Sequence, residues 1–115
     1  MTIYKFADVV LVGFPFTNLK TIKKRPAVVL SDETYQQSRH DVILMAVTSQ
    51  IRQPPGYGEF VLSDWQQAGL LKPSVLKPLI ATVEQTQVLN HMGTLSPLDQ
   101  ELLFTSLQTL FGQKQ

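Results

Sequence analysis

A cluster of basic residues lies just before a short apolar stretch. It consists of Lys20, Lys23, Lys24 and Arg25, four of the ten basic residues of the 115-residue chain, and no acidic residue lies among them. The formal net charge of the chain is only +1, so the remainder without this cluster is net acidic. The low net charge disfavours a protein that coats nucleic acid. The local patch is typical either of a solvated loop or of a small phosphate-binding site.

Arg25 is the member of this cluster whose position is best defined. A guanidinium group stays charged at any working pH and offers a planar fork of donors to phosphate oxygens. Pro26 fixes its own backbone and biases Arg25 toward an extended conformation, so we expect Arg25 at the start of a strand. Rigid placement suits a site, but a charge that only keeps a strand end soluble explains the residue equally well.

A second group of polar side chains, Thr48, Ser49 and Gln50, follows the apolar residues 41–47. A hydroxyl group at a strand end can point into a cleft or cap the end of the strand. Taken alone, these residues favour capping.

The familiar catalytic motifs are absent from the sequence. There is no Walker loop, no G-x-S-x-G, no H-E-x-x-H and no glycine-rich dinucleotide turn. The chain has no cysteine, and its two histidines are His40 and His91. A zinc site needs three or four ligands, so we expect neither a metal nor another cofactor. We interpret both histidines as loop residues, with His40 the better placed to approach a ligand.

Short apolar stretches rich in β-branched residues and bounded by turn residues predict five or six strands. The clearest cover residues 8–14, 25–31, 41–49, 58–63 and 78–84. Strands of this length and spacing are typical of a small antiparallel barrel or sandwich. Residues 63–71 are expected to form one helical turn that begins at Ser63 and ends at Gly69, with Trp65 anchoring it to the core or to a partner.

The C-terminal segment predicts an amphipathic helix. Ser96 is a good N-cap, Pro97 suits the first helical position, and Gly112 is placed to end the helix. Apolar residues between them follow a period close to 3.6. We find no repeat or linker and expect a single domain, residues 1–115. No apolar stretch is long enough to span a membrane and no signal peptide is evident, so we expect a cytoplasmic protein.

Three stretches of the sequence resemble the MazF/PemK family of toxin endoribonucleases from bacterial toxin–antitoxin modules. They are RPAVVLS (25–31), TSQ (48–50) and LSDWQQAGLLKPS (62–74), within a similarity that runs from Asp8 to the final helix. The resemblance implies a mainly β fold, an SH3-like antiparallel barrel of five to seven short strands with a C-terminal α-helix. It also implies a homodimer, metal-independent cleavage of single-stranded RNA, and a cognate antitoxin whose disordered acidic C-terminal tail folds over the toxin.

The same resemblance implies roles for individual residues. Arg25 corresponds to the family's catalytic arginine and Thr48 to its catalytic threonine. The residues expected to bind substrate are Ser49, Gln50, Lys23, Lys24, Lys77 and Phe16. Phe14, Phe16 and Tyr57 could stack on unpaired bases, although core or interface packing is the commoner role of such residues. Cleavage would use the ribose 2′-hydroxyl as nucleophile, with Arg25 stabilising the charge that develops on the phosphoryl oxygens.

One position departs from the family pattern. Some branches place an arginine and an aspartate in the strand that matches residues 76–83. Here Lys77 keeps the cation, but Leu79 stands where the carboxylate is expected. The general base is therefore open, with Glu84 or a water molecule as candidates.

Two other functions remain as alternatives to the nuclease. One is a non-catalytic binder on the same barrel, such as an inhibitor that docks onto a topoisomerase. The other is a family member that has kept antitoxin binding and lost cleavage. Arg25 together with the hydroxyl groups at 48 and 49 favours the nuclease. Leu79, in place of the expected carboxylate, leaves the inactive family member as an alternative.

Overall fold

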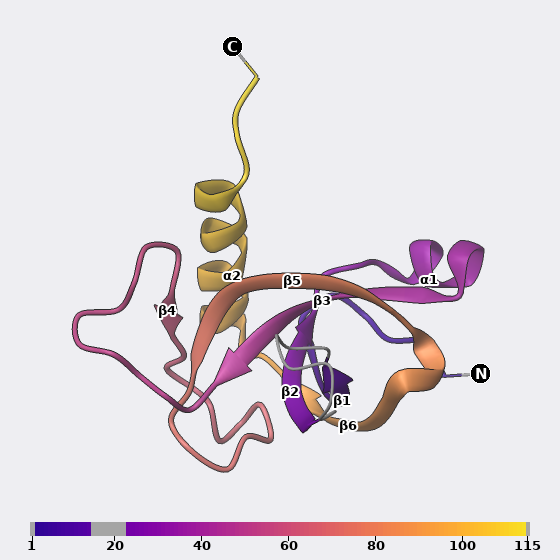
Figure 1. Ribbon diagram of the computed structural model, residues 1–115, viewed down its shortest axis with the longest axis horizontal. Coiled ribbons are helices and arrows are strands. Elements are labelled where there is room, and N and C mark those ends of the chain that lie inside the picture. Colours follow the sequence, from indigo (N-terminus) through magenta and orange to yellow (C-terminus); the bar gives the residue numbers. More distant parts are fainter. Residues whose placement is uncertain (1, 15–22, 115) are drawn as a thin grey trace.

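A six-stranded antiparallel sheet forms most of the molecule in the computed structural model, which describes residues 2–14 and 23–114 (Figure 1). The elements in chain order are β1 (Asp8–Phe14), β2 (Lys23–Val29), α1 (Glu33–Arg39), β3 (Asp41–Thr48), β4 (Phe60–Val61), β5 (Val75–Glu84), the 3-10 helix η1 (Gln85–Gln87), β6 (Val88–Thr94) and α2 (Pro97–Leu110). The order of strands across the sheet is β4-β5-β3-β2-β1-β6. The predicted fold class, mainly β with a C-terminal helix, is confirmed.

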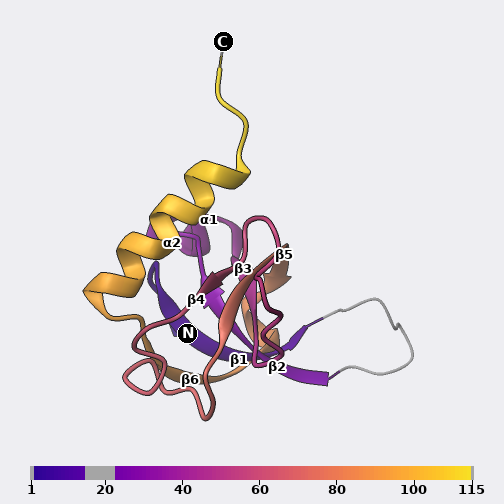
Figure 2. The same cartoon turned by 90° about the vertical axis from the view of Figure 1, so that its left-hand side faces the viewer.

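The sheet is strongly curved, because β5 arches over β3 and leads through η1 into β6 (Figure 1). β6 then pairs with β1, at the other edge of the sheet from β4. The helix α2 lies along one side of the sheet (Figure 2). None of the helices in the described part of the chain is long and apolar enough to cross a membrane.

Both faces of the central strands are buried in separate apolar clusters. One cluster includes Val28 and Met45 and is covered by Leu103 of α2. The other includes Ala27 and Ala46, their neighbours along the same two strands. Because side chains of a strand alternate between the two faces, β2 from Ala27 onward and β3 from Val42 to Val47 need apolar residues at every position. This explains why their sequences read as continuous apolar stretches.

The start of α2 is joined to the turn before β5 by buried hydrogen bonds. The Ser96 hydroxyl oxygen accepts a hydrogen bond from the Asp99 backbone N–H, as an N-cap does, and the hydroxyl lies 2.6 Å from the Asp64 carboxylate, to which it donates. Asp99 is fully buried and accepts the backbone N–H groups of Ser63 and Asp64 at 2.9 and 2.8 Å. The expected N-cap role of Ser63 is wrong, because the first helical hydrogen bond of the following turn is accepted by the Asp64 carbonyl oxygen.

Residues 65–69 form one hydrogen-bonded turn in which the Ala68 N–H donates to the Asp64 oxygen, four residues earlier, so the expected single helical turn is present. Gly69 ends this segment with a φ of +84°, and a Cβ there would collide with the backbone oxygen of Met92. A Cβ on Gly93 of β6 would in turn lie 2.5 Å from the Ala68 oxygen. The turn and β6 thus approach each other backbone to backbone, which glycine alone allows. Trp65 packs against the cluster beneath α2, as expected for an anchor.

Three elements were not predicted, namely α1, the short η1 and β6. Helix α1 has only one buried residue, Gln36, so it lacks the apolar stripe by which helices are recognised. Its ends are defined by Asp32, which accepts the Tyr35 N–H, and by His40, whose backbone is left-handed. Strand β6 was missed because most of its residues are exposed or half-buried, and it places His91 on a strand, not in a loop as expected.

The bounds of the remaining elements differ only at their ends. β2 begins two residues earlier than predicted and β5 three, while β4 keeps only two of the residues expected there. Helix α2 ends at Leu110 with Phe111 as its C-cap, so Gly112 is not the cap residue.

Asp99→Ala is expected to lower the free energy of unfolding by about 3 kcal/mol, because it leaves two backbone donors without an acceptor. Urea unfolding followed by circular dichroism measures the change. Glu101→Ala, at an exposed position of the same helix, is the control and should change the value by less than about 0.5 kcal/mol. Equal losses in the two variants would contradict the structural role assigned to Asp99.

Candidate active site

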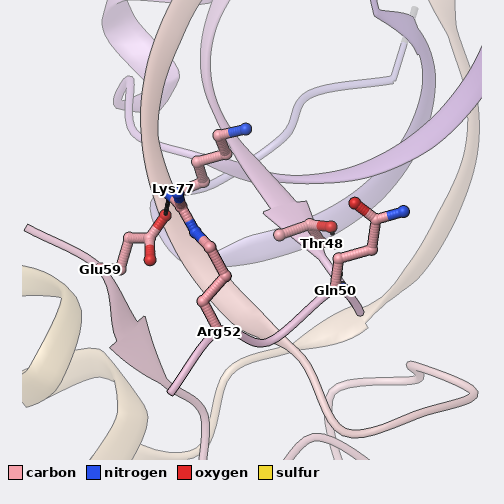
Figure 3. A pocket seen from close by; sticks show the side chains of 5 residues that line it. All are labelled: Thr48, Gln50, Arg52, Glu59 and Lys77. Carbon is pink, nitrogen blue, oxygen red and sulfur yellow. Dashed lines mark hydrogen bonds and ion pairs between the residues drawn. The ribbon is translucent and has the colours of Figure 1, made fainter. Parts of the chain in front are cut away.

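A pocket of about 260 Å³ lies where β3 ends, and polar side chains line it. The lining residues are Thr48, Gln50, Arg52, Glu59 and Lys77 (Figure 3). Thr48 ends β3 and pairs with Val75 of β5, two residues before Lys77. Gln50, Arg52 and Glu59 belong to the segment between β3 and β4. The structure thus brings together three of the predicted site residues, Thr48, Gln50 and Lys77, with two that were not predicted.

Arg25 lies at the same end of the sheet as Thr48. The register of β2 and β3 pairs Ala27 with Ala46; Arg25 lies two positions before Ala27 and Thr48 two positions after Ala46. Ala27 and Ala46 belong to the apolar cluster on the face away from α2. By strand alternation, Arg25 and Thr48 continue this face beyond its apolar part. Arg25 is exposed, and it is not among the described residues that line the pocket.

Lys77 and Leu79 lie two residues apart on β5, so their side chains share one face of that strand. Leu79 packs against the cluster on the face away from α2. Lys77 precedes it by two residues and is exposed. The position where the family pattern suggested a carboxylate is therefore a core position in this chain, and Lys77 is the first polar residue beyond the core.

Thr48 also has a local structural role. Its Oγ1 accepts the backbone N–H of Gln50 at 3.1 Å, so the hydroxyl caps the end of β3. The hydroxyl hydrogen remains a donor, and one oxygen can accept and donate at once. Capping therefore orients the hydroxyl of a residue that also lines the pocket.

Glu59 holds Arg52 in place beside Lys77. Its Oε1 accepts the Gly56 backbone N–H at 2.6 Å, and its Oε2 lies 3.0 Å from Arg52 Nη2. The side chain of Glu59 is 7% exposed, whereas that of Arg52 is 73% exposed. The hydrogen bond from Gly56 lowers the pKa of Glu59 below its usual 4.5, and the hydrogen bond from Arg52 lowers this pKa further. Glu59 is therefore an anion at neutral pH and a poor proton acceptor.

Neither Glu84 nor His40 can reach the pocket. Glu84 pairs with Asp41 at the start of β3, and His40 directly precedes Asp41. At roughly 3.3 Å per residue, the start of β3 lies about 20 Å from Thr48. The structure therefore excludes Glu84 as the general base at this pocket of the chain, and His40 does not line the pocket.

The other predicted site residues surround the pocket or lie outside the described residues. Lys23 and Lys24 are exposed at the start of β2, next to Arg25, and Ser49 is exposed after Thr48. Phe16 lies in the segment 15–22, outside the described residues. Tyr57 is 81% exposed in the segment between β3 and β4. Among residues 2–14 and 23–114, no three His, Asp or Glu side chains are grouped as metal ligands.

Arg52 was missed because residues 51–57 lie between two predicted strands, and Glu59 because residues 58–63 were predicted only as a strand. The signal available was a pair of opposite charges on either side of the turn sequence QPPGYG. Such a pair often lies in solvent, so the sequence alone gives little reason to choose it.

Glu59→Gln is expected to destabilise the protein at about pH 7 and to do so less at about pH 3. The pKa of Glu59 is lowered in the folded state, so its stabilising contribution is present above 4.5 and is lost as the pH falls through the folded-state value. The measurement is the difference in free energy of unfolding between wild type and variant at both pH values. A difference that stays constant or grows in acid would contradict the ionised role.

The comparisons with known proteins agree on one family. The sequence matches, over residues 5–111, the family described as PemK-like, MazF-like toxin of type II toxin–antitoxin system. No curated protein sequence gives a match. A crystal structure of MazF from Deinococcus radiodurans has a TM-score of 0.77 at 17% identity and covers 98% of this chain and 100% of that chain.

Two further solved structures have the same fold and contain an antitoxin. The MazE–MazF complex (Form-II) from Deinococcus radiodurans has a TM-score of 0.74 at 19% identity, over 99% of this chain and 100% of that chain. An endoribonuclease in complex with its cognate antitoxin from Mycobacterial species has a TM-score of 0.71 at 16% identity, over 95% of this chain and 93% of that chain. At these identities the structures show the fold, while the match over residues 5–111 establishes the family. This chain belongs to the PemK-like, MazF-like toxins of type II toxin–antitoxin systems.

Proposed function

We propose that this toxin is an endoribonuclease that cuts single-stranded RNA by attack of the ribose 2′-hydroxyl on the adjacent phosphate. Two observations carry this proposal: Thr48 and Lys77 line one pocket, and the register of β2 and β3 puts Arg25 at the same end and on the same face of the sheet as Thr48. These residues supply two cations and a hydroxyl group, all of which can donate hydrogen bonds to phosphoryl oxygens. Such a set suits stabilisation of a phosphorane more than it suits acyl or hydride transfer.

The reaction would divide its tasks among these residues. The 2′-oxygen attacks phosphorus and the 5′-oxygen leaves, which gives a 2′,3′-cyclic phosphate and a 5′-hydroxyl end. Arg25 binds the phosphoryl oxygens as their charge grows, and Lys77 adds a second cation. Thr48, oriented by its hydrogen bond with Gln50, donates to the phosphate. DNA lacks the attacking hydroxyl and is not cut.

The proton acceptor for the 2′-hydroxyl is a water molecule in this proposal. Glu59 is the carboxylate that lines the pocket, and its lowered pKa makes it a weak base. Glu84, the other candidate, is at the far end of β3. Arg25 and Lys77 favour deprotonation of the hydroxyl by stabilising the anion that follows.

The partners in this proposal are RNA, an antitoxin and a second copy of the chain, all in the cytoplasm. Structures of similar fold contain a toxin with its antitoxin, which supports a cognate antitoxin here. Lys23, Lys24 and Arg25 are consecutive exposed cations. They would attract either the RNA backbone or the acidic C-terminal tail of an antitoxin, and the two would compete for this surface.

The second candidate function is a toxin that binds its antitoxin and does not cut RNA. The packing of Leu79 in the core favours it, because a carboxylate could not replace this side chain without disturbing the apolar cluster. No observation in the described residues favours the topoisomerase inhibitor.

Cleavage of a long single-stranded RNA of mixed sequence, in EDTA, tests the proposal. Wild type is expected to give fragments with 2′,3′-cyclic phosphate ends, identified by mass spectrometry. Arg25→Ala should lower the rate by at least about 100-fold and Thr48→Ala by about tenfold, because each removes a donor to the transition state. Arg39→Ala, at an exposed arginine that ends α1, is the matched control and should cut like wild type. Absence of cleavage by wild type on several such RNAs would favour the second candidate.

A further inference from the structure

The cations of the pocket differ in how they are held. Two hydrogen bonds with Gly56 hold Glu59 independently of Arg52. Oε1 of Glu59 accepts the Gly56 N–H, and the backbone N–H of Glu59 donates to the Gly56 oxygen at 3.0 Å. Arg52 reaches this fixed carboxylate through Nη2. Figure 3 shows its side chain extending from the segment after β3 toward Glu59, with Thr48 and Gln50 across the pocket. Glu59 thus determines where the guanidinium group lies.

The contact leaves most of the guanidinium group available. Within residues 2–14 and 23–114, no acceptor binds Nε or Nη1 of Arg52, and its side chain is 73% exposed. An ion pair with so exposed an arginine contributes little to stability. Its position between a buried carboxylate and an open polar pocket gives it a different use, because a planar fork held at one nitrogen presents its other donors in a fixed direction.

We propose that Arg52 binds a phosphate of the RNA backbone and that Glu59 is the positioning residue that orients it for this contact. The proposal rests on the function proposed above. It adds to the same site a phosphate contact made by Arg52, which lies in the segment between β3 and β4. Glu59 does not touch the RNA in this arrangement. Two cations, Arg52 and Lys77, against one carboxylate leave the pocket with a net charge of +1, which suits a phosphodiester.

Glu59→Gln separates positioning from simple electrostatics. The glutamine oxygen can still accept the Gly56 N–H, but its amide nitrogen is a donor and cannot hold Arg52. If Glu59 acted only through its charge, its removal from an RNA-binding pocket would tighten binding. If it positions Arg52, its removal weakens binding. The two roles of Glu59 therefore predict opposite changes in the Kd for RNA when Glu59 is replaced by glutamine.

The experiment measures the Kd of a mixed-sequence single-stranded RNA with 2′-fluoro riboses by fluorescence anisotropy at several salt concentrations. This RNA lacks the attacking hydroxyl, so binding is measured without cleavage. Arg52→Ala should raise the Kd about tenfold and reduce the slope of log K against log salt by about 0.7, the value for one phosphate contact of a single strand. Glu59→Gln should raise the Kd about threefold, and the double variant should equal Arg52→Ala. Arg39→Ala and Glu101→Gln are the matched controls for loss of an exposed arginine and an exposed glutamate.

Three outcomes would overturn the proposal: unchanged binding in Arg52→Ala, tighter binding in Glu59→Gln, or an equal effect of Glu59→Gln with and without Arg52. The last would show that Glu59 acts through its loop. Thermal unfolding of each variant excludes loss of the fold as the cause. Wild type that binds this RNA in the expected pattern and cuts no ordinary RNA would overturn the nuclease alone. Wild type that cuts RNA, with binding insensitive to Arg52, would overturn the positioning role alone.

Discussion

Burial of both faces of β2 and β3 is the constraint on which the rest of the structure depends. A strand that is apolar on both sides has no position along its length for a polar group, so chemistry is confined to its ends. β2 and β3 are antiparallel, which places the start of one beside the end of the other. Arg25 near the start of β2 and Thr48 at the end of β3 lie at the same end of the sheet for this reason, although 22 residues lie between them in the sequence.

The start of β5 brings Lys77 to the same end of the sheet, and its pairing with β3 is irregular there. The register shifts between Met45 and Val47, so β5 inserts extra residues opposite this part of β3. Such bulges bend a strand and redirect its side chains, and they are frequent beside active sites. Lys77 lies in the inserted stretch. The curvature that closes the sheet and the placement of a cation in the pocket therefore have one structural origin.

The sequence predicts the strands and α2 well because their signals are local. The strand 8–14 has the predicted bounds, and Ser96 caps α2 as its type and position suggested. Helix α1 was not predicted, because its end caps and one buried glutamine stabilise it and it has no apolar stripe. In the site, Thr48 and Lys77 were found through resemblance to a family. The Arg52–Glu59 pair was not, because an ion pair across a turn becomes informative only once burial of the carboxylate is known. Excluding Glu84 likewise required the pairing register, which no local pattern contains.

The buried carboxylate of Asp99 has a consequence for motion. Its two acceptor bonds and the bond from Ser96 to Asp64 tie the first turn of α2 to residues 63 and 64. Residues 68 and 69, four positions on, are in backbone contact with β6. Exposing any one of these segments to water would break hydrogen bonds in the next, so they should open together as a single cooperative unit of local unfolding. Leu110 at the other end of α2 lies against Gly58, next to Glu59, so the opening of this unit would also loosen one wall of the pocket.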